Sequence, residues 1–292
     1  MPRSEYHERI VQYYRESEDA YRDSWDLSKS LSIHYGYRDE KALTFRESLQ
    51  RMNEVMAEFA FIGGGERVLD AGCGVGGSSI FLAKNFGCRV TGITLSEQQA
   101  EAAMKNASKR GTAELTDFRV MNFMKTDFPD EQFDIVWGCE SICYADDKAA
   151  FVKEAFRILK PGGRLVIADG MVTRFEYNDH PVNRKWLDGW QVNYLESPER
   201  FCEHFEAAGF GEIRHRDITQ ETSHSSKRLN RMYYLARIYL KWMWLKGRRP
   251  TDMQKKNIDA CRYQYLSRKK GLSGYSVISG KKPLFGPEPP SL

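Results

Sequence analysis

The stretch from Arg67 to Gln99 combines a short apolar strand, a glycine-rich turn, a helix and a second strand. Asp70 stands at the end of the first strand, and the turn places Gly72, Gly74 and Gly76 directly after it. Glycine has no Cβ atom, so a ligand can approach the backbone closely. In open α/β sheets, ligands bind beyond the carboxyl ends of the strands. The pattern therefore predicts a ligand site at this turn.

The carboxylate of Asp70 indicates which kind of ligand the turn would hold. In dinucleotide-binding folds the glycines open a helix that faces a pyrophosphate, and an acid about 20 residues further on contacts a ribose. Here the acid precedes the glycines, where it would repel a pyrophosphate. A carboxylate suits an ammonium group or a sulfonium-bearing amino acid. These residues favour S-adenosylmethionine over NAD, and a purely structural turn is the alternative.

Three motifs carry a family resemblance. The pattern D-x-G-x-G-x-G at residues 70–76 resembles motif I of the class I S-adenosylmethionine-dependent methyltransferases. FPDEQFDIVW at 128–137 and LKPGGRLVIAD at 159–169 resemble later motifs of the same superfamily. The resemblance covers residues 60–170. It implies an α/β fold with a Rossmann-like sheet of seven strands, mostly parallel with the last strand antiparallel, and S-adenosylmethionine as the cofactor.

The end of the second strand departs from the commonest methyltransferase pattern, because Thr94 stands where many members have an acid for the ribose. Thr-Leu-Ser-x-x-Gln is similar to the tocopherol, prenyl-diphosphate, sterol and cyclopropane-fatty-acid branch. By that resemblance Thr94, Leu95, Ser96 and Gln99 would line the ribose. Without a carboxylate, the ribose loses a charge-assisted hydrogen bond of roughly twice the neutral strength. Asn122 would accept from the adenine amino group, or it is only a polar loop residue.

The segments HYGY and CESICYADDK also resemble this branch, whose members methylate prenyl chains, sterols or quinol rings on carbon, or bulky natural products on oxygen or nitrogen. Methyl transfer to an alkene creates a carbocation. Glu140, just past the fourth strand, could stabilise that cation or remove its proton; alternatively it caps a helix or binds a hydroxyl. Tyr144 and Tyr35 are further catalytic candidates. For a phenol or amine acceptor, proximity and one base could suffice.

The N-terminal residues 1–62 are predicted to form a helical lid. Tyr14 to Tyr37 is unusually rich in Tyr and Trp, and aromatic rings attract cations such as a sulfonium. Tyr14 is therefore a candidate contact to the methyl donor. The alternative is a helical layer that only packs on the sheet, which the helical spacing of the apolar residues in 44–62 favours.

Residues 222–273 are predicted to form a second helical insertion. Between Lys227 and Lys270 the chain has fourteen Lys and Arg residues and two acids, while the whole chain carries only +4. Such an excess indicates an anionic partner or surface. Three interpretations stay open: a cap over an apolar substrate, a membrane-surface helix, and a nucleic-acid face.

The remaining boundaries follow from the motifs. They predict a donor-binding core at 63–170, a cap insertion at 171–195, the rest of the core at 196–221 and 274–283, and a mobile tail at 284–292. In the cap, Trp186, Trp190 and Tyr194 recur at helical spacing and are expected on one helix face. Ser78 and Ser79 are expected to cap the helix over 80–85, and Phe118–Asn122 is expected as the third strand.

Composition excludes several classes of protein. No apolar run of about 18 residues is present, so no transmembrane helix is expected. MPRSEYHERI lacks the apolar core of a secretion signal. Six scattered cysteines suit a reducing compartment, so a cytoplasmic protein is expected. No cluster of metal ligands stands out, and no metal is expected.

Taken together, these residues predict a methyltransferase that acts on a hydrophobic small molecule, with carbon methylation of a prenyl, terpenoid or quinol-type acceptor as the first choice. Oxygen or nitrogen methylation of a bulky natural product is the second. An RNA methyltransferase that uses the basic segment, and a donor-binding protein without chemistry, are further alternatives. A homo-oligomer is also conceivable.

Overall fold

The computed structural model describes residues 4–25, 27–247 and 249–284, with only the backbone described for 18–24 and 28. The chain divides into two compact units, each assembled from three chain segments. Unit 1 contains Met1–Met52, Gly170–Ser197 and Asp217–Tyr275. Unit 2 contains Asn53–Asp169, Pro198–Arg216 and Ser276–Leu292. Both predicted caps and residues 1–52 of the predicted lid fall within unit 1, whereas residues 53–62 of the lid fall within unit 2. Unit 1 also contains Gly170, 196–197, 217–221 and 274–275, which were assigned to the core.

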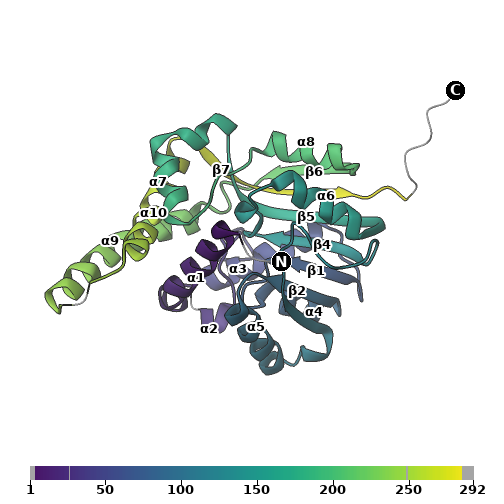
Figure 1. Ribbon diagram of the computed structural model, residues 1–292, viewed down its shortest axis with the longest axis horizontal. Coiled ribbons are helices and arrows are strands. Elements are labelled where there is room, and N and C mark those ends of the chain that lie inside the picture. The colour runs from purple at the N-terminus through teal and green to yellow at the C-terminus, as the bar shows by residue number, and fades with distance from the viewer. Residues whose placement is uncertain (1–3, 26, 248, 285–292) are drawn as a thin grey trace. The chain divides into compact units, whose positions relative to one another are not determined.

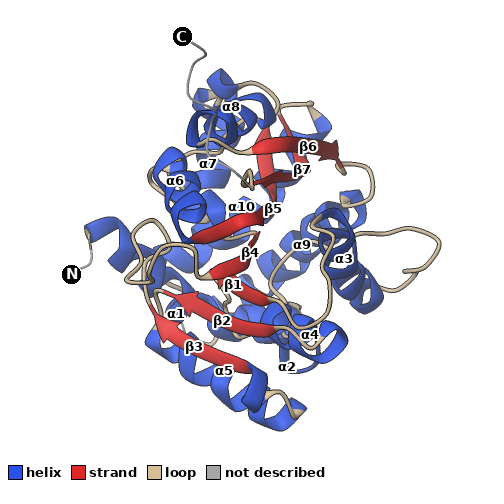
Figure 2. Cartoon of the chain, turned by 90° about the vertical axis from the view of Figure 1, so that its right-hand side faces the viewer, coloured by secondary structure: helices blue, strands red, loops and turns tan. Residues whose placement is uncertain are grey.

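Seven strands form one mixed sheet in the order β3-β2-β1-β4-β5-β7-β6 (Figure 2). Strands β1 to β5 pair in parallel. The predicted Rossmann-like sheet with an antiparallel last strand is confirmed. The strands are β1 (Arg67–Ala71), β2 (Arg89–Thr94), β3 (Thr116–Val120), β4 (Phe133–Cys139), β5 (Leu159–Val172), β6 (Gly211–Asp217) and β7 (Ser273–Lys281).

Helices join most of these strands (Figure 1). They are α1 (Glu5–Ser24), α2 (Leu27–Ser30), α3 (Phe45–Phe59), α4 (Gly77–Phe86), α5 (Glu97–Arg110), α6 (Lys148–Ile158), α7 (Pro181–Gly189), α8 (Pro198–Ala208), α9 (Ser223–Leu245) and α10 (Asp252–Lys269). Three short 3-10 helices are η1 (Ala113–Leu115), η2 (Ile142–Tyr144) and η3 (Phe175–Asp179).

The central strands of unit 2 are buried on both faces. Leu69 in β1 and Ile135 and Trp137 in β4 are at most 1% exposed. Such strands read as continuous apolar runs because helices cover both sides of a parallel sheet. Helices α4 and α5 pack against β2 and β3, and α6 packs on α8. Gly87 and Gly111 end α4 and α5 in the left-handed conformation, which glycine adopts without strain.

Helix α10 is the centre of unit 1, where α7, α9 and α1 all pack against it. Gly189 permits the closest approach, since a Cβ atom there would lie 2.4 Å from the carbonyl oxygen of Lys256. The hydroxyl of the fully buried Tyr13 donates to Asn257 Oδ1 at 3.2 Å and so joins α1 to α10. Thr251 starts α10 with a capping box.

Three predictions about local structure are wrong. Ser78 and Ser79 do not cap α4, because the helix begins at Gly77 and both serines lie in its first turn. Strand β3 ends at Val120, two residues before Asn122. Helix α7 ends at Gly189, so Trp186, Trp190 and Tyr194 do not share one helix face. The predicted tail lies outside the described residues, apart from Leu284.

Candidate functional site

Asp70 joins the first strand to the helix that follows it. The residue is only 2% exposed, and its Oδ2 accepts a hydrogen bond of 2.6 Å from the Ser79 hydroxyl. Burial raises the pKa of this carboxyl from its usual value near 3.8 to about 6, against the opposing effect of the Ser79 hydrogen bonds. The N-cap residue of α4, Gly76, supplies no side-chain cap. Asp70 therefore takes the capping role that was predicted for the serines.

The three motif glycines differ in what surrounds them. A Cβ atom on Gly72 would lie 2.2 Å from the Cβ of Ser141, so packing requires a glycine there. On Gly76 it would approach Ala103 and Phe118 at 3.1 Å. At Gly74, with φ of 51°, no atom lies within 4 Å of the added Cβ. Gly74 thus faces open space, and the backbone at this point is free to meet a ligand.

The loop after β2 is held by its own side chains. Thr94 Oγ1 donates to Gln99 Oε1 at 2.7 Å and accepts from the Ser96 N–H at 3.2 Å. The Ser96 hydroxyl in turn caps α5 by accepting from the Gln99 N–H. Leu95 is half-buried between them. Three of the four residues predicted at the ribose, Thr94, Ser96 and Gln99, thus form one small hydrogen-bonded cluster at the carboxyl end of β2, and Leu95 lies between them in sequence.

Asn122 lies in the turn that follows β3. Its side-chain oxygen Oδ1 accepts a hydrogen bond of 2.9 Å from the Met124 N–H, and its backbone carbonyl accepts from the Lys125 N–H. A carbonyl oxygen has two lone pairs. The predicted contact to an adenine amino group would therefore use the second lone pair of Oδ1, while the first lone pair holds the turn.

Glu140 has an unusual backbone conformation. Its φ is 49°, in the left-handed region that side chains other than Gly, Asn and Asp rarely adopt. The residue is half-buried directly after β4, and its N–H donates to the Ala168 carbonyl of β5 at 2.9 Å. Strain of this kind is held by the surrounding fold and concentrates at functional sites. The sequence alone carries no signal for it.

Side chains from three directions fix the loop that follows Glu140. The Ser141 hydroxyl donates to the Ala71 carbonyl of β1, and the Cys143 N–H donates to Asp169 Oδ2 at 2.8 Å. Lys148 is 1% exposed, and its Nζ donates to the carbonyls of Cys143 at 3.1 Å and Ala145 at 2.7 Å. Sequence reasoning missed these anchors, because a lysine at a helix start is normally exposed.

Tyr144 belongs to this anchored loop, in η2, and is half-buried. Cys139 and Cys143 flank Glu140, and burial raises the pKa of both thiols well above the usual range. Both thiols therefore stay protonated and are poor nucleophiles. Among the described residues, no group of three or more His, Cys, Asp or Glu is placed to hold a metal ion.

Comparison with known proteins gives the family. Residues 69–167 match a family model described as a methyltransferase domain. The 2-methyl-6-phytyl-1,4-hydroquinone methyltransferase of Synechocystis sp. is 42% identical over 54% of this chain and 51% of its own length. The 27-O-demethylrifamycin SV methyltransferase of Amycolatopsis mediterranei is 31% identical over 70% of this chain and 75% of its own length. The chain belongs to the S-adenosylmethionine-dependent methyltransferase family.

The family resemblance predicted from the motifs is thus confirmed. This methyltransferase spans about half the length of the Synechocystis relative. Among solved structures, the [4+2]-cyclase SpnF shares the fold with a TM-score of 0.79 at 23% identity, over 98% of this chain and 99% of the other. At that identity the likeness establishes the fold, and fold alone does not determine the reaction.

The remaining two site candidates of the methyltransferase, Tyr35 and Tyr14, lie in unit 1. Tyr35 is 4% exposed, its hydroxyl donates to Gln264 Oε1 at 2.8 Å, and its ring stacks on Tyr275. The guanidinium of Arg268 lies 4.8 Å from the centre of the same ring. These contacts place Tyr35 in the core of unit 1, and its catalytic role stays a prediction.

Tyr14 is half-buried in α1 and packs edge-on against Tyr13 at 5.3 Å between ring centres. His180, the lone histidine of the cap segment, accepts from the Val182 N–H through Nδ1 and caps α7. The structure therefore gathers Asp70, the glycine turn, the Thr94–Gln99 loop, Glu140 and Tyr144 in unit 2. A contact of Tyr14 with the donor stays a prediction.

Proposed function

We propose that this methyltransferase transfers a methyl group from S-adenosylmethionine to a carbon atom of a hydrophobic prenylated acceptor of the quinol type. The proposal draws on the relative named for a phytyl hydroquinone, which is 42% identical over the shared region. A quinol ring and a prenyl double bond both offer electron-rich carbon. Both substrates also leave a proton to be removed after the new carbon–carbon bond has formed.

The residues of unit 2 suit the methyl donor. The open space at Gly74 gives an extended ligand access to the backbone, and the bonded cluster from Thr94 to Gln99 offers hydroxyl and amide groups for a ribose. Asn122 offers its remaining lone pair to an adenine. When bound, S-adenosylmethionine supplies an electrophilic methyl group on a sulfonium. The protein contributes positioning and exclusion of water.

Glu140 is the observation that carries the chemical proposal. It is a carboxylate held in a strained left-handed conformation, half-buried at the carboxyl end of β4. Methyl transfer to carbon would form a C–C bond as the sulfur–methyl bond of the donor breaks, and it would leave a cation next to a C–H bond. In the proposed step, the Glu140 carboxylate takes up that proton, the C–H electron pair neutralises the cation, and S-adenosylhomocysteine leaves.

Glu140→Gln tests this step, because the amide keeps the size and the backbone strain but cannot accept a proton. We expect kcat to fall by roughly 10²- to 10⁴-fold, the usual contribution of general acid–base catalysis. The Kd for S-adenosylmethionine, measured by calorimetry, should not change. Undiminished turnover of a prenylated hydroquinone by Glu140→Gln would remove Glu140 from the mechanism.

A second candidate function is oxygen methylation of a bulky natural product. It is favoured by the rifamycin relative, which this chain covers over 75% of its length. Nuclear magnetic resonance of the methylated product distinguishes a new C–CH₃ group from a new O–CH₃ group. Donor binding without methyl transfer to any acceptor would instead favour a protein that keeps the fold and changes the chemistry, as the cyclase likeness illustrates.

Among the described residues, no helix is both long and apolar enough to cross a membrane. A hydrophobic small molecule is the partner that the family relatives support. The membrane-surface contact through residues 222–273, the homo-oligomer and the expectation that nucleic acid is not a partner remain predictions.

A further inference from the structure

Helix α9 exposes an unusually large apolar surface. Its seven exposed large apolar side chains have exposed fractions from 51% to 75%, and they are Tyr234, Leu235, Ile238, Tyr239, Trp242, Trp244 and Leu245. The first half of the helix is different, because Ser225, Ser226 and Leu229 are buried. The second half of α9 therefore carries an apolar surface that the fold of unit 1 leaves uncovered. Contiguous patches of this kind mark interaction sites.

Six of these seven exposed residues lie on one side of the helix, and Trp244 lies outside it. At roughly 100° per residue, Tyr234, Ile238, Trp242 and Leu245 lie together with Leu235 and Tyr239 within an arc of about 140°. Leu240 and Met243 lie outside that arc and are half-buried. Helix α10 packs against α9, and the Arg237–Asp259 ion pair at 3.7 Å joins the two (Figure 1). Helix α10 thus packs on α9 while the six apolar side chains of this arc stay exposed.

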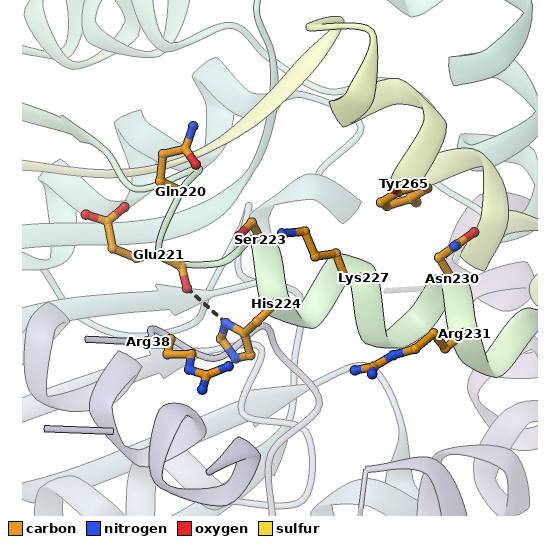
Figure 3. A pocket seen from close by; sticks show the side chains of 9 residues that line it. All are labelled: Arg38, Gln220, Glu221, Ser223, His224, Lys227, Asn230, Arg231 and Tyr265. Carbon is orange, nitrogen blue, oxygen red and sulfur yellow. Dashed lines mark hydrogen bonds between the residues drawn. The ribbon is translucent and has the colours of Figure 1, made fainter. Parts of the chain in front are cut away.

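Basic side chains continue the exposed face toward the start of α9. Lys227 and Arg231 fall on the same side of the helix as Tyr234 and Ile238. Together with Arg38, they line a pocket of about 520 Å³ in unit 1 (Figure 3). Glu221 is the one carboxylate in its lining, and burial lowers the pKa of His224, so His224 is neutral at pH 7. Within the described residues, these three cations form no ion pairs. The pocket therefore suits an anion.

The combination of aromatic, aliphatic and basic side chains on α9 favours a lipid surface over a nucleic acid. Trp and Tyr prefer the boundary between water and lipid, where their rings are apolar and their N–H and O–H groups stay wet. Aliphatic Leu235, Ile238 and Leu245 gain from burial in acyl chains but cannot stack on nucleic-acid bases. Cations at one end of an apolar helix face match the phosphates of a bilayer whose tails accept the rest.

We propose that the exposed face of α9, from Lys227 to Leu245, docks this protein on the surface of an anionic phospholipid bilayer. The apolar arc enters the interface with the helix lying in its plane. Lys227, Arg231 and Arg38 hold lipid phosphate. The inference rests on unit 1 alone and does not depend on which acceptor is methylated.

Co-sedimentation of the full chain with vesicles tests the proposal. We expect binding to phosphatidylcholine vesicles that contain phosphatidylglycerol, weaker binding to phosphatidylcholine alone, and loss of that difference at high salt. The double variant Leu235→Glu/Ile238→Glu should bind at least roughly a hundredfold more weakly, about tenfold for each apolar side chain kept from the lipid. Lys227→Gln/Arg231→Gln should reduce the preference for the anionic lipid several-fold.

Met104→Glu is the matched control, because Met104 is a 48% exposed apolar residue on α5 in unit 2. It should bind vesicles as the unchanged protein does. Calorimetry with S-adenosylmethionine should give the same Kd for all variants. It tests the methyltransferase function independently, so failure of that function can be told apart from failure of this proposal. Absence of vesicle binding, or equal binding by the Leu235→Glu/Ile238→Glu variant, would overturn the proposal. Two further outcomes would overturn the proposal. In both, vesicles stay unbound while the unchanged protein forms a dimer or binds single-stranded RNA, and the Leu235→Glu/Ile238→Glu variant does not.

Discussion

At the scale of single residues, two carboxylates in opposite situations shape the site. Asp70 is buried, bonded to Ser79 and carries a raised pKa. Glu140 is half-buried and held in a strained conformation. Asp70 therefore supports the architecture of the glycine turn, whereas Glu140 is the carboxylate to which the proposed function gives the chemistry.

The buried carboxyl of Asp70 predicts a pH effect on stability. Because its pKa is about 6 in the folded protein and near 3.8 otherwise, the folded state binds the proton more tightly. The contribution of Asp70 to stability thus falls as the pH rises from about 4 to about 6, by roughly 3 kcal/mol at most. The Asp70→Asn variant has no carboxyl group to titrate at this position, so its unfolding free energy should not show this fall. Urea unfolding of both proteins between pH 4 and 7 measures the two unfolding free energies. If they differed by the same amount at every pH, the raised pKa of Asp70 would be contradicted.

The two glycines predict opposite outcomes for the same substitution. Gly72→Ala should lose about 3 kcal/mol or more of unfolding free energy, because its Cβ meets Ser141 at 2.2 Å. Gly74→Ala meets no atom and should lose only about 1–2 kcal/mol from its left-handed backbone. Gly74→Ala should nevertheless weaken binding of S-adenosylmethionine, measured by calorimetry. Donor binding that is unaffected by Gly74→Ala would show that the donor does not use this opening.

Tyr35→Phe separates a structural role from a catalytic one. The variant loses the hydrogen bond to Gln264, whose oxygen still accepts from Ser226. We expect a loss of about 1 kcal/mol in unfolding free energy and an unchanged kcat. A fall in kcat of tenfold or more at constant stability would support the catalytic role predicted from the sequence.

Some of these residues could be identified from the sequence, and others could not. Asp70 and the glycines were predictable because their spacing in a strand-turn-helix unit has a direct physical reason. The strain at Glu140 and the burial of Lys148 were not predictable. Glu140 bonds to Ala168, which is distant in sequence, and Lys148 bonds to backbone carbonyls of the preceding loop, whose path the sequence does not show. The burial of Tyr35 was not predictable either, because its partners Gln264 and Tyr275 lie more than two hundred residues away in sequence.

At the scale of elements, the loop from Glu140 to Ala145 owes its shape to β1, β5 and α6. Ala71, Asp169 and Lys148 each hold it by a hydrogen bond. The succession of strands and helices along the chain could be predicted from the motifs. The end of α7 could not, because aromatic residues at helical spacing continue past Gly189 while the backbone turns there to let α7 meet α10.

Lys148→Met tests the anchoring of this loop. Methionine fills a similar volume but leaves the carbonyls of Cys143 and Ala145 without their donor. We expect a loss of about 2–4 kcal/mol in unfolding free energy, together with reduced kcat because Glu140 and Tyr144 lie in the loop. Lys153→Met on the exposed side of α6 is the control and should change stability by less than about 0.5 kcal/mol. Equal stability of the two variants would contradict the anchoring role.

At the scale of the whole molecule, donor binding is expected to stabilise the fold. A ligand that binds only the folded state adds about 2.7 kcal/mol at a concentration of 100 Kd. For a chain of this size, this should raise the Tm by several degrees in a thermal melt with S-adenosylmethionine. Gly74→Ala should show a smaller rise. A Tm that is independent of S-adenosylmethionine would contradict donor binding by the isolated protein.

The assembly of unit 1 from three distant segments has a consequence during synthesis. Tyr13 and Tyr35 find their partners, Asn257 and Gln264, more than two hundred residues later in the chain. A ribosome that adds about 5–20 residues per second reaches those partners only after roughly 10–50 seconds. Throughout that interval Tyr13 and Tyr35 lack these hydrogen-bond partners. We therefore expect the nascent chain to recruit chaperones early, and expression yield to respond to translation speed more strongly than the stability of the finished protein suggests.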